Sequence, residues 1–258
     1  MELYDQLTDG RARFVRLDEL CRRAAELRPR LLPSAAELAA ESVRAQRDKL
    51  GVEKQQGAFV AEVLADPAAG PHLCHAMLLP RADSAERLAE YERTGVLELP
   101  GASVHRVGKA SVVTTRNPRF LNAEDATTID GFEIAIDVAT LDARSEICVM
   151  RGGVVDHPKY AGRRLFGAGI NLTHLYQGKI PYLWYLTRDL GLVNKLYRGV
   201  ALPDVSPEVG SVEKPWIAAV EGFAIGGHCQ ILLAVDHTIA ADDAYLTLPT
   251  SGETSGRA

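Results

Sequence analysis

The sequence has few cysteines and lacks a long apolar run. Its four cysteines, Cys21, Cys74, Cys148 and Cys229, are scattered without a CxxC pair, which is typical of a reduced, cytoplasmic protein. No apolar run approaches the ~18 residues that a membrane span needs. The polar start, residues 1–9, has no basic segment followed by an apolar one, so no secretory signal is predicted. We therefore expect a cytoplasmic protein without a membrane partner.

The sequence also lacks a basic excess and a recognisable metal-binding pattern. It holds 29 Lys and Arg against 34 Asp and Glu, a net charge of −5, whereas nucleic-acid-binding domains carry clustered basic residues. His72, Cys74 and His75 lie close together, but their spacing matches no standard zinc pattern. We interpret them as ordinary side chains at a helix end, and we expect neither a nucleic-acid partner nor a metal.

Residues 1–94 have the pattern of a helical region. Apolar residues recur at three- and four-residue spacing, and Pro29 ends the first such run. Ser34 and Glu37 form a capping-box pattern that opens a helix, and Gly51 is its expected stop. No catalytic pattern occurs here, so we interpret the region as a packing or oligomerisation module. The expected helices are 14–27, 34–50, 57–64 and 84–93.

From about Gly95 the pattern changes to short strands that alternate with helices. Runs rich in β-branched residues are separated by glycine and proline, and two apolar runs are typical of buried parallel strands. This alternation predicts an α/β domain with largely parallel pairing over residues 95–249. The expected strands are 96–99, 104–107, 110–115, 147–150, 216–220 and 237–240. The expected helices are 123–141, 182–197 and 228–235, and 201–212 is expected to be a loop.

Two glycine-containing turns stand out in this domain, Phe166 to Leu172 and Val220 to His228. Each follows a buried strand and leads towards a helix, whose first N–H groups have no internal partners. Glycine lets the backbone approach a ligand closely, so two facing turns would aim two N–H groups at one oxygen, an oxyanion hole. Tight packing explains either turn alone. A phosphate-binding site is a further interpretation, although neither turn has the G-x-G-x-x-G or G-x-x-x-x-G-K-[ST] order.

The turns occur in a definite order with three other motifs, Arg-Asn-Pro at 116–118, Phe-Leu-Asn-Ala at 120–123 and Lys-Pro-Trp-Ile-Ala-Ala-Val at 214–220. In this order the chain resembles the crotonase (enoyl-CoA hydratase/isomerase) superfamily over about residues 95–249. The resemblance implies a spiral of ββα turns, with the helical N-terminal region outside it. It also implies an acyl-CoA thioester as ligand, with residues 121–123 near the CoA, and trimers or dimers of trimers.

The same resemblance implies that the N–H groups of Ile170 and Gly227 hold the thioester oxygen. The hydratases of the superfamily use two glutamates, whose positions match Gln230 and Thr250 here. An amide and a threonine hydroxyl are poor proton donors and acceptors for this purpose. Hydration is therefore disfavoured on chemical grounds.

Three segments, 156–164, 178–185 and 226–230, resemble one subgroup, the cofactor-independent dioxygenases that act on 3,5-dihydroxyphenylacetyl-CoA. That resemblance implies an enolate held by the oxyanion hole, electron transfer from it to O2, and attack of the peroxide on the thioester carbonyl. The products are 3,5-dihydroxyphenylglyoxylate and CoA, an antibiotic precursor reaction in which O2 is the co-substrate and no cofactor is needed. Other crotonase-type lyases, isomerases or thioesterases, and an inactive acyl-CoA-binding homologue, remain alternatives.

Further site residues are proposed by the same resemblance, each with a structural alternative. Gln230 is expected to hydrogen-bond the ring hydroxyls or position the acyl group, or else to cap the helix that Gly227 begins. Arg188 binds a phenolic oxygen or is a solvated helix charge. Glu124 contacts substrate, as does the turn at Gly226, or Glu124 serves only as an acid at a helix N-terminus. His228 assists proton transfer or packs under the loop.

The resemblance stops at Pro249. The tail 250–258 is small and polar, and we expect it to be disordered. Because the superfamily's core continues past this point, the chain is expected to be a truncated, frame-shifted or partial product, or a short member that completes its fold with a partner. It would then expose apolar surface, be poorly soluble alone and lack dioxygenase activity.

Overall fold

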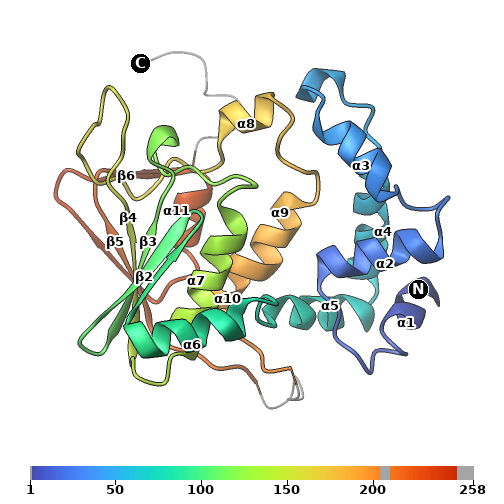
Figure 1. The fold of residues 1–258 in the computed structure, drawn as a ribbon, viewed down its shortest axis with the longest axis horizontal. Coiled ribbons are helices and arrows are strands. Elements are labelled where there is room, and N and C mark those ends of the chain that lie inside the picture. Colours follow the sequence, from blue (N-terminus) through green and yellow to red (C-terminus); the bar gives the residue numbers. More distant parts are fainter. Residues whose placement is uncertain (1, 204–209, 249–258) are drawn as a thin grey trace. The chain divides into compact units, whose positions relative to one another are not determined.

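The computed structural model describes residues 2–203 and 210–248, which form two compact units (Figure 1). The first unit consists of Met1–Pro80 and Leu172–Val212, and the second of Arg81–Asn171 and Glu213–Ala258. The sequence predicted a helical region over 1–94, an α/β domain over 95–249 and a tail over 250–258. The structure instead divides the chain at Pro80 and adds the segment 172–212 to the helical unit. The tail 250–258 lies outside the described residues.

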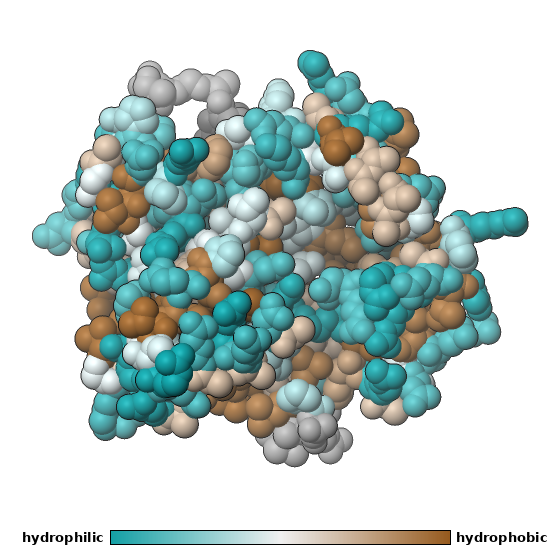
Figure 2. Space-filling model, in the orientation of Figure 1, coloured by the Kyte–Doolittle hydropathy of each residue, from teal (hydrophilic) through white to brown (hydrophobic). Residues whose placement is uncertain are grey.

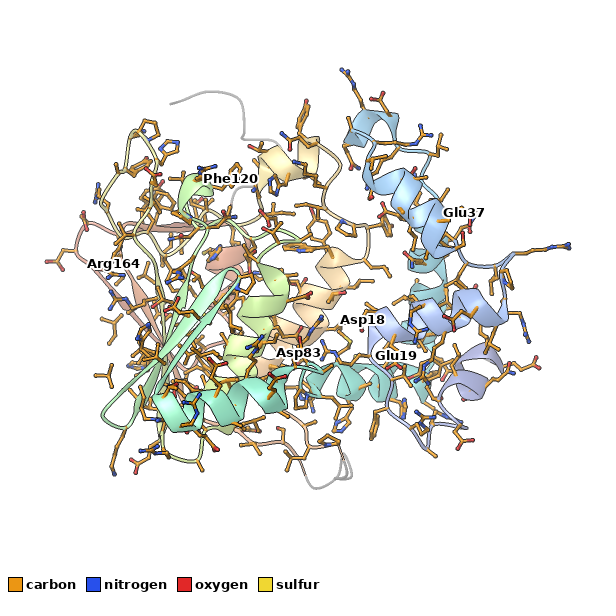
Figure 3. The ribbon with its side chains drawn as sticks, viewed as in Figure 1. Asp18, Glu19, Glu37, Asp83, Phe120 and Arg164 are labelled. Atoms are coloured by element: carbon orange, nitrogen blue, oxygen red, sulfur yellow. The ribbon has the colours of Figure 1, made fainter. Side chains whose placement is uncertain are left out.

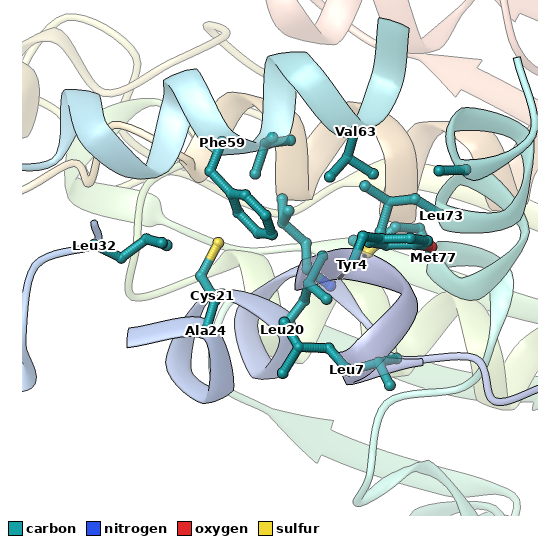
Figure 4. Packing of buried hydrophobic residues seen from close by; sticks show 14 residues of the cluster. Tyr4, Leu7, Leu20, Cys21, Ala24, Leu32, Phe59, Val63, Leu73 and Met77 are labelled. Atoms are coloured by element: carbon teal, nitrogen blue, oxygen red, sulfur yellow. Dashed lines mark hydrogen bonds between the residues drawn. The ribbon is translucent and has the colours of Figure 1, made fainter. Parts of the chain in front are cut away.

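The first unit is helical, as the sequence predicted. Its core gathers apolar side chains from helices α1, α2, α4 and α5, among them Tyr4, Leu20, Phe59 and Met77 (Figure 4). Burial of these side chains stabilises the unit by roughly 1.5–3 kcal/mol each. The N-terminal elements are α1 (Glu2–Leu7), α2 (Leu17–Leu27), α3 (Ala35–Ser42), η1 (Gln46–Asp48), α4 (Lys54–Ala65) and α5 (Ala69–Leu78).

The helix expected from Ser34 to Leu50 is shorter than predicted. Its capping box forms: the Ser34 side chain accepts the Glu37 N–H, and the Glu37 side chain accepts the Ser34 N–H. Figure 3 labels Glu37. However, α3 ends at Ser42, because the buried carboxylate of Glu41 accepts the N–H groups of Leu50 and Gly51. That contact folds the chain back into a short 3-10 turn. Hydrogen bonds between Glu41 and residues further along the chain thus outweigh the local helix propensity.

The helix expected at 182–197 is present and contains an irregular centre. It comprises α9 (Trp184–Thr187), the π-helical turn η3 (Arg188–Val193) and α10 (Asn194–Arg198), preceded by α8 (Leu172–Tyr176). Leu183, Leu186 and Leu190 pack against the core of the N-terminal helices. This apolar contact explains why the segment belongs to the first unit.

The second unit is an α/β domain built on a six-stranded sheet with the order β1-β2-β3-β4-β5-β7. The first three strands pair antiparallel, and β3, β4, β5 and β7 pair in parallel. The parallel part confirms the prediction from the alternating pattern. The strands are β1 (Val96–Leu99), β2 (Ala102–Val107), β3 (Ala110–Thr115), β4 (Ile147–Gly152), β5 (Trp216–Val220) and β7 (His237–Ala240); a second, parallel pair joins β6 (Phe223–Ile225) to β8 (Tyr245–Thr247).

Two longer helices, α6 (Ser84–Thr94) and α7 (Ile129–Leu141), pack on each other and against the β1–β3 part of the sheet (Figure 1). The helix predicted from residue 123 begins only at Ile129, because Asp125 forms a local turn with the N–H of Thr127 and the hydroxyl of Thr128. The shorter elements are η2 (Pro118–Phe120) and α11 (Gly227–Ile231). The helix expected at 228–235 therefore ends earlier than predicted.

Apolar side chains are exposed on the last described elements of the second unit. Every residue of β7 is exposed, and Leu233, Ile239 and Tyr245 have exposed fractions of 76%, 59% and 50%. On the face drawn in Figure 2, apolar residues are scattered among hydrophilic ones. Within residues 2–203 and 210–248, no helix has the length and apolar character that crossing a bilayer requires.

Candidate active site

The two glycine-containing turns lie side by side in the second unit. Gly167 pairs with Ala224 in a parallel bridge: the Gly167 N–H donates to the Phe223 carbonyl at 3.1 Å, and the Ile225 N–H donates to the Gly167 carbonyl at 3.0 Å. Ile170 and Gly227 each lie three residues beyond this isolated bridge.

The turns remain in close contact beyond the bridge. A β-carbon added to Gly169 would lie 2.7 Å from the Ile225 carbonyl oxygen and 3.0 Å from the Gly227 nitrogen. Gly169 and Gly226 have φ angles of +77° and +55°, a region that favours glycine. Both the space and the backbone conformation therefore require glycine at position 169, and this residue, which precedes Ile170, lies against Gly227.

The direction of the Ile170 N–H follows from its peptide unit. The Gly169 carbonyl accepts the Glu124 N–H at 2.7 Å, and the Asn171 N–H donates to the Glu124 carbonyl at 2.8 Å. In a trans peptide the C=O and the following N–H point in opposite directions. Because the Gly169 carbonyl faces Glu124, the Ile170 N–H points away from Glu124.

A side chain from the second turn holds the first one. The ring of His228 is fully buried, and its Nδ1 accepts the Gly169 N–H at 3.0 Å. The nitrogen that accepts carries no proton, so in the neutral ring the proton is on Nε2. The ring meets Phe166 edge-on, with 5.8 Å between centroids, and a β-carbon on Gly167 would lie 2.3 Å from it.

The segment that carries Glu124 is anchored by buried polar side chains. The Asn171 amide donates to Asp125 Oδ2 at 2.7 Å, and the Asn117 amide donates to the same oxygen at 3.1 Å. Asn122, in the left-handed region at φ +57°, donates to the carbonyls of Gly153 and Leu165 at 2.8 Å each. Fully bonded networks of this kind fix a backbone in one arrangement. The first turn is therefore rigidly placed.

Gly226, Gly227 and Gln230 lie together at the start of α11. Gly227 is its first residue, and the Gln230 N–H donates to the Gly226 carbonyl at 2.9 Å. Gln230 is half-buried, three residues after Gly227. The second glutamate of the hydratases was matched to Thr250, which lies outside the described residues.

Glu124 and Arg188 differ from the expected setting. Glu124 does not open a helix but pairs with Ile170 in a parallel bridge; its side chain is 3% exposed, and its Oε2 lies 4.0 Å from His228 Nδ1. Arg188 belongs to the first unit, where it begins the π-helical turn η3 and bonds Asp189 Oδ1 at 2.7 Å. Only 3% of the Arg188 surface is exposed, which excludes the alternative interpretation of Arg188 as a solvated helix charge.

The cluster of His72, Cys74 and His75 is not arranged as a metal site. His72 Nδ1 lies 2.6 Å from the Tyr4 hydroxyl and its Nε2 lies 3.0 Å from the Arg11 carbonyl oxygen, so both ring nitrogens have protein partners. Among the described residues, no three His, Cys, Asp or Glu side chains gather as metal ligands would. His72 and Cys74 lie within α5, and His75 lies in its last turn.

Comparison with protein-family models shows the family of the chain. The family model described as enoyl-CoA hydratase/isomerase matches residues 108–252, more than half of the sequence. The chain belongs to the enoyl-CoA hydratase/isomerase family. This confirms the resemblance that the order of motifs indicated, together with the crotonase-like fold expected for the second unit.

Individual members of the enoyl-CoA hydratase/isomerase family are similar over different lengths. The (3,5-dihydroxyphenyl)acetyl-CoA 1,2-dioxygenase of Amycolatopsis orientalis is 49% identical over 98% of this chain and 58% of its own length. The short-chain-enoyl-CoA hydratase of Clostridium acetobutylicum is 29% identical over 60% of this chain and 52% of its own. A solved enoyl-CoA hydratase/isomerase from Xanthobacter autotrophicus Py2 has a TM-score of 0.46, 24% identity, and coverage of 58% and 49%. The chain thus spans little more than half the length of these curated relatives.

The site of this enoyl-CoA hydratase/isomerase family member includes one contact that sequence reasoning missed. The sequence identified Ile170, Gly226, Gly227 and Gln230, which the structure brings together. It did not predict that His228 bonds the opposite turn. The available signal was an imidazole within a glycine-rich turn, since a large polar side chain at a close approach needs a partner.

Proposed function

We propose that the N–H groups of Ile170 and Gly227 bind the thioester oxygen of an acyl-CoA. One observation supports this most strongly: the two turns touch, since a β-carbon on Gly169 would lie 3.0 Å from the Gly227 nitrogen, and the Ile170 N–H points away from the Glu124 segment. Two backbone donors aimed at one carbonyl stabilise the charge that develops when the thioester enolises, and loss of one donor typically costs ~10²–10³ in rate.

We further propose that the reaction is dioxygenation of 3,5-dihydroxyphenylacetyl-CoA. The 49% identity to the named dioxygenase over nearly the whole chain supports this. So does Gln230, whose amide stands where the hydratases use a glutamate and cannot exchange protons as a carboxylate does. Removal of a Cα proton gives the enolate, O2 accepts its electrons, and the peroxide attacks the carbonyl. One arylacetyl-CoA and one O2 give one arylglyoxylate and one CoA thiol.

The roles of the remaining residues follow from this proposal. Gln230, three residues after a donor, hydrogen-bonds the ring hydroxyls. Gly226 shapes the turn against the acyl group. Glu124 acts through its backbone, which bonds Gly169 and Asn171 and so aims the Ile170 N–H. A phenol-binding role for Arg188 stays a prediction from the resemblance.

The test uses the polypeptide as its host produces it, natively purified with any chain that accompanies it. The thioester, labelled with ¹³C at its carbonyl, is first bound without oxygen, and its infrared stretch is expected to fall relative to the thioester in water. Addition of ¹⁸O2 is then expected to give labelled arylglyoxylate. An unshifted carbonyl would contradict the oxyanion hole. A shifted carbonyl without oxygen uptake would contradict dioxygenation alone.

Hydration is the second candidate, and the enoyl-CoA hydratases among the relatives favour it. It predicts loss of the conjugated double bond of crotonyl-CoA under the same conditions. Hydration faster than oxygen uptake with the aryl thioester would replace our proposal by this one.

A further inference from the structure

We propose that His228 is a positioning residue that fixes the two oxyanion donors relative to each other. The inference rests on the proposed function, because it concerns how the same two N–H groups are held. His228 follows Gly227 directly in α11, and its ring crosses to the other turn, where Nδ1 accepts the Gly169 N–H at 3.0 Å. His228, which follows the proposed donor Gly227, is therefore bonded to Gly169, which precedes the proposed donor Ile170.

Gly169, the residue before Ile170, is held at both of its backbone polar groups. The Gly169 N–H is bonded by His228, and the Gly169 carbonyl is bonded by the Glu124 N–H at 2.7 Å. That carbonyl and the Ile170 N–H belong to one planar group, so they rotate together. If the bond to His228 were lost, a glycine with a flexible backbone would be held on only one side, and the direction of the Ile170 N–H would be less well defined.

The environment of His228 argues against direct contact with the substrate. Its ring is fully buried, and Nδ1 is already engaged. The cavity beside it, which Asn122, Glu124 and Thr115 also line, has a volume of about 10 Å³. Such a space is the size of one water molecule and excludes an acyl group. The ring thus acts through Gly169 rather than on the reacting atoms.

The fit of the ring against Gly167 supports a fixed geometry. A β-carbon at Gly167 would lie 2.3 Å from the ring, and Phe166 meets the ring edge-on. The imidazole is consequently confined between the backbone of the bridge and an aromatic side chain. Confinement of this kind orients Nδ1 towards Gly169, and residues that support a site in this way define its geometry.

The experiment compares His228→Asn with His228→Leu. The asparagine oxygen takes the place of Nδ1 as an acceptor, whereas leucine fills similar space and accepts nothing. With the bound ¹³C-carbonyl thioester, we expect His228→Leu to lose most of the infrared shift and to lower kcat by about tenfold or more, with KM little changed, since one weakened donor costs up to ~10²–10³. His228→Asn should retain the shift and stay within a few-fold of the native kcat.

Tyr91→Phe is the matched control. It removes one buried hydrogen bond of the same unit, the 2.9 Å contact with Ser111 Oγ, without touching either turn. We expect a loss of stability and an unchanged carbonyl shift. If folded His228→Leu keeps the full shift, or if His228→Asn loses as much as His228→Leu, the positioning role is wrong.

A second measurement, on the native protein, tests the positioning role of His228 even where a variant fails to fold. In ¹⁵N-labelled protein, His228 should show an unprotonated Nδ1, a protonated Nε2 and a coupling across the hydrogen bond to the Gly169 N–H. A protonated Nδ1 would overturn the inference. Absence of any carbonyl shift in native protein would contradict the proposed function instead, while a native shift without oxygen uptake leaves the comparison of His228 variants decisive.

Discussion

Gly167 pairs with Ala224, and this parallel bridge brings the two glycine-containing turns side by side. Beyond the bridge the turns stay in contact, because Gly169, the residue before Ile170, lies against the backbone of Gly227. The oxyanion hole that we propose is therefore a consequence of strand-like pairing between two loops. Its donors depend on backbone placement, which makes the site sensitive to substitutions that alter the backbone and less so to those that alter side chains.

Replacement of Gly227 by proline tests the donor at that position. Proline lacks the N–H, but it is tolerated at the first residue of a helix, which Gly227 is in α11. We expect Gly227→Pro to fold and to lower turnover by ~10²–10³. Gly227→Ala keeps the N–H and is the control. Near-native oxygen uptake by folded Gly227→Pro would rule out this donor.

Replacement of Gly169 by alanine tests the contact between the turns. Gly169 and Gly162 have nearly the same φ, +77° and +79°, but only at Gly169 would a β-carbon meet other atoms. Gly162→Ala should cost about 1–2 kcal/mol from the left-handed backbone alone. Gly169→Ala should cost more and also reduce the carbonyl shift. Chemical denaturation measures both, and equal losses would show that the turns do not pack as described.

Gln230→Ala tests recognition of the ring. A lost hydrogen bond matters only where the substrate supplies a partner, so turnover of the dihydroxyphenyl thioester should fall more than that of an unsubstituted phenylacetyl thioester. Cys229→Ala, the neighbouring residue, serves as the control. If Gln230→Ala lowers both rates equally, Gln230 has a structural role such as capping α11.

Acid should weaken the second unit through Asp142. Burial acts to raise the pKa of Asp142, but its bonds with Arg106, at 2.8 and 3.0 Å, outweigh this and hold the pKa below its usual value. The unfolded pKa is about 3.9, so the stabilisation is complete above that pH and is lost as the pH falls through the lower, folded value. Asp142→Asn should flatten this dependence of the unfolding free energy. Glu146→Gln, in an exposed pair with Lys109, should leave it unchanged.

The exposed apolar residues of the second unit should promote self-association. Leu233 and Ile239 are 76% and 59% exposed, and all of β7 is exposed, an arrangement that leaves an edge strand available to other chains. The double substitution Leu233→Glu and Ile239→Lys should shift sedimentation profiles of the isolated chain towards smaller species. Val107→Lys removes a similarly exposed apolar residue elsewhere, 64% exposed, and should have little effect. An equal effect of both would point to general hydrophobicity.

The sequence predicted elements whose signals are local. The bounds of β1, β3, β5 and β7 are as expected, because short β-branched runs between glycine and proline leave few alternatives. The capping box at Ser34 and Glu37 also forms as predicted. The order of the glycine motifs was sufficient to identify the family, since that order is a property of the chain itself.

Features that depend on distant residues were not predictable in the same way. The early end of α3 depends on the carboxylate of Glu41 reaching Leu50 and Gly51. The late start of α7 depends on Asp125, whose carboxylate bonds the distant Asn171 as well as the nearby Thr127. The strands β6 and β8 contain β-favouring residues, but three residues are too short for a pattern, and the strands form because they pair with each other.

The ring of His228 fills the space that a side chain at position 167 would need, and this has an evolutionary consequence. Any side chain at position 167 would collide with the imidazole, so a lineage can gain one there only after the histidine has been exchanged for something smaller. The order of the two changes matters, and the reverse order passes through a damaged intermediate. Among related genes, positions 167 and 228 should therefore vary as a pair, with histidine at the second found together with glycine at the first.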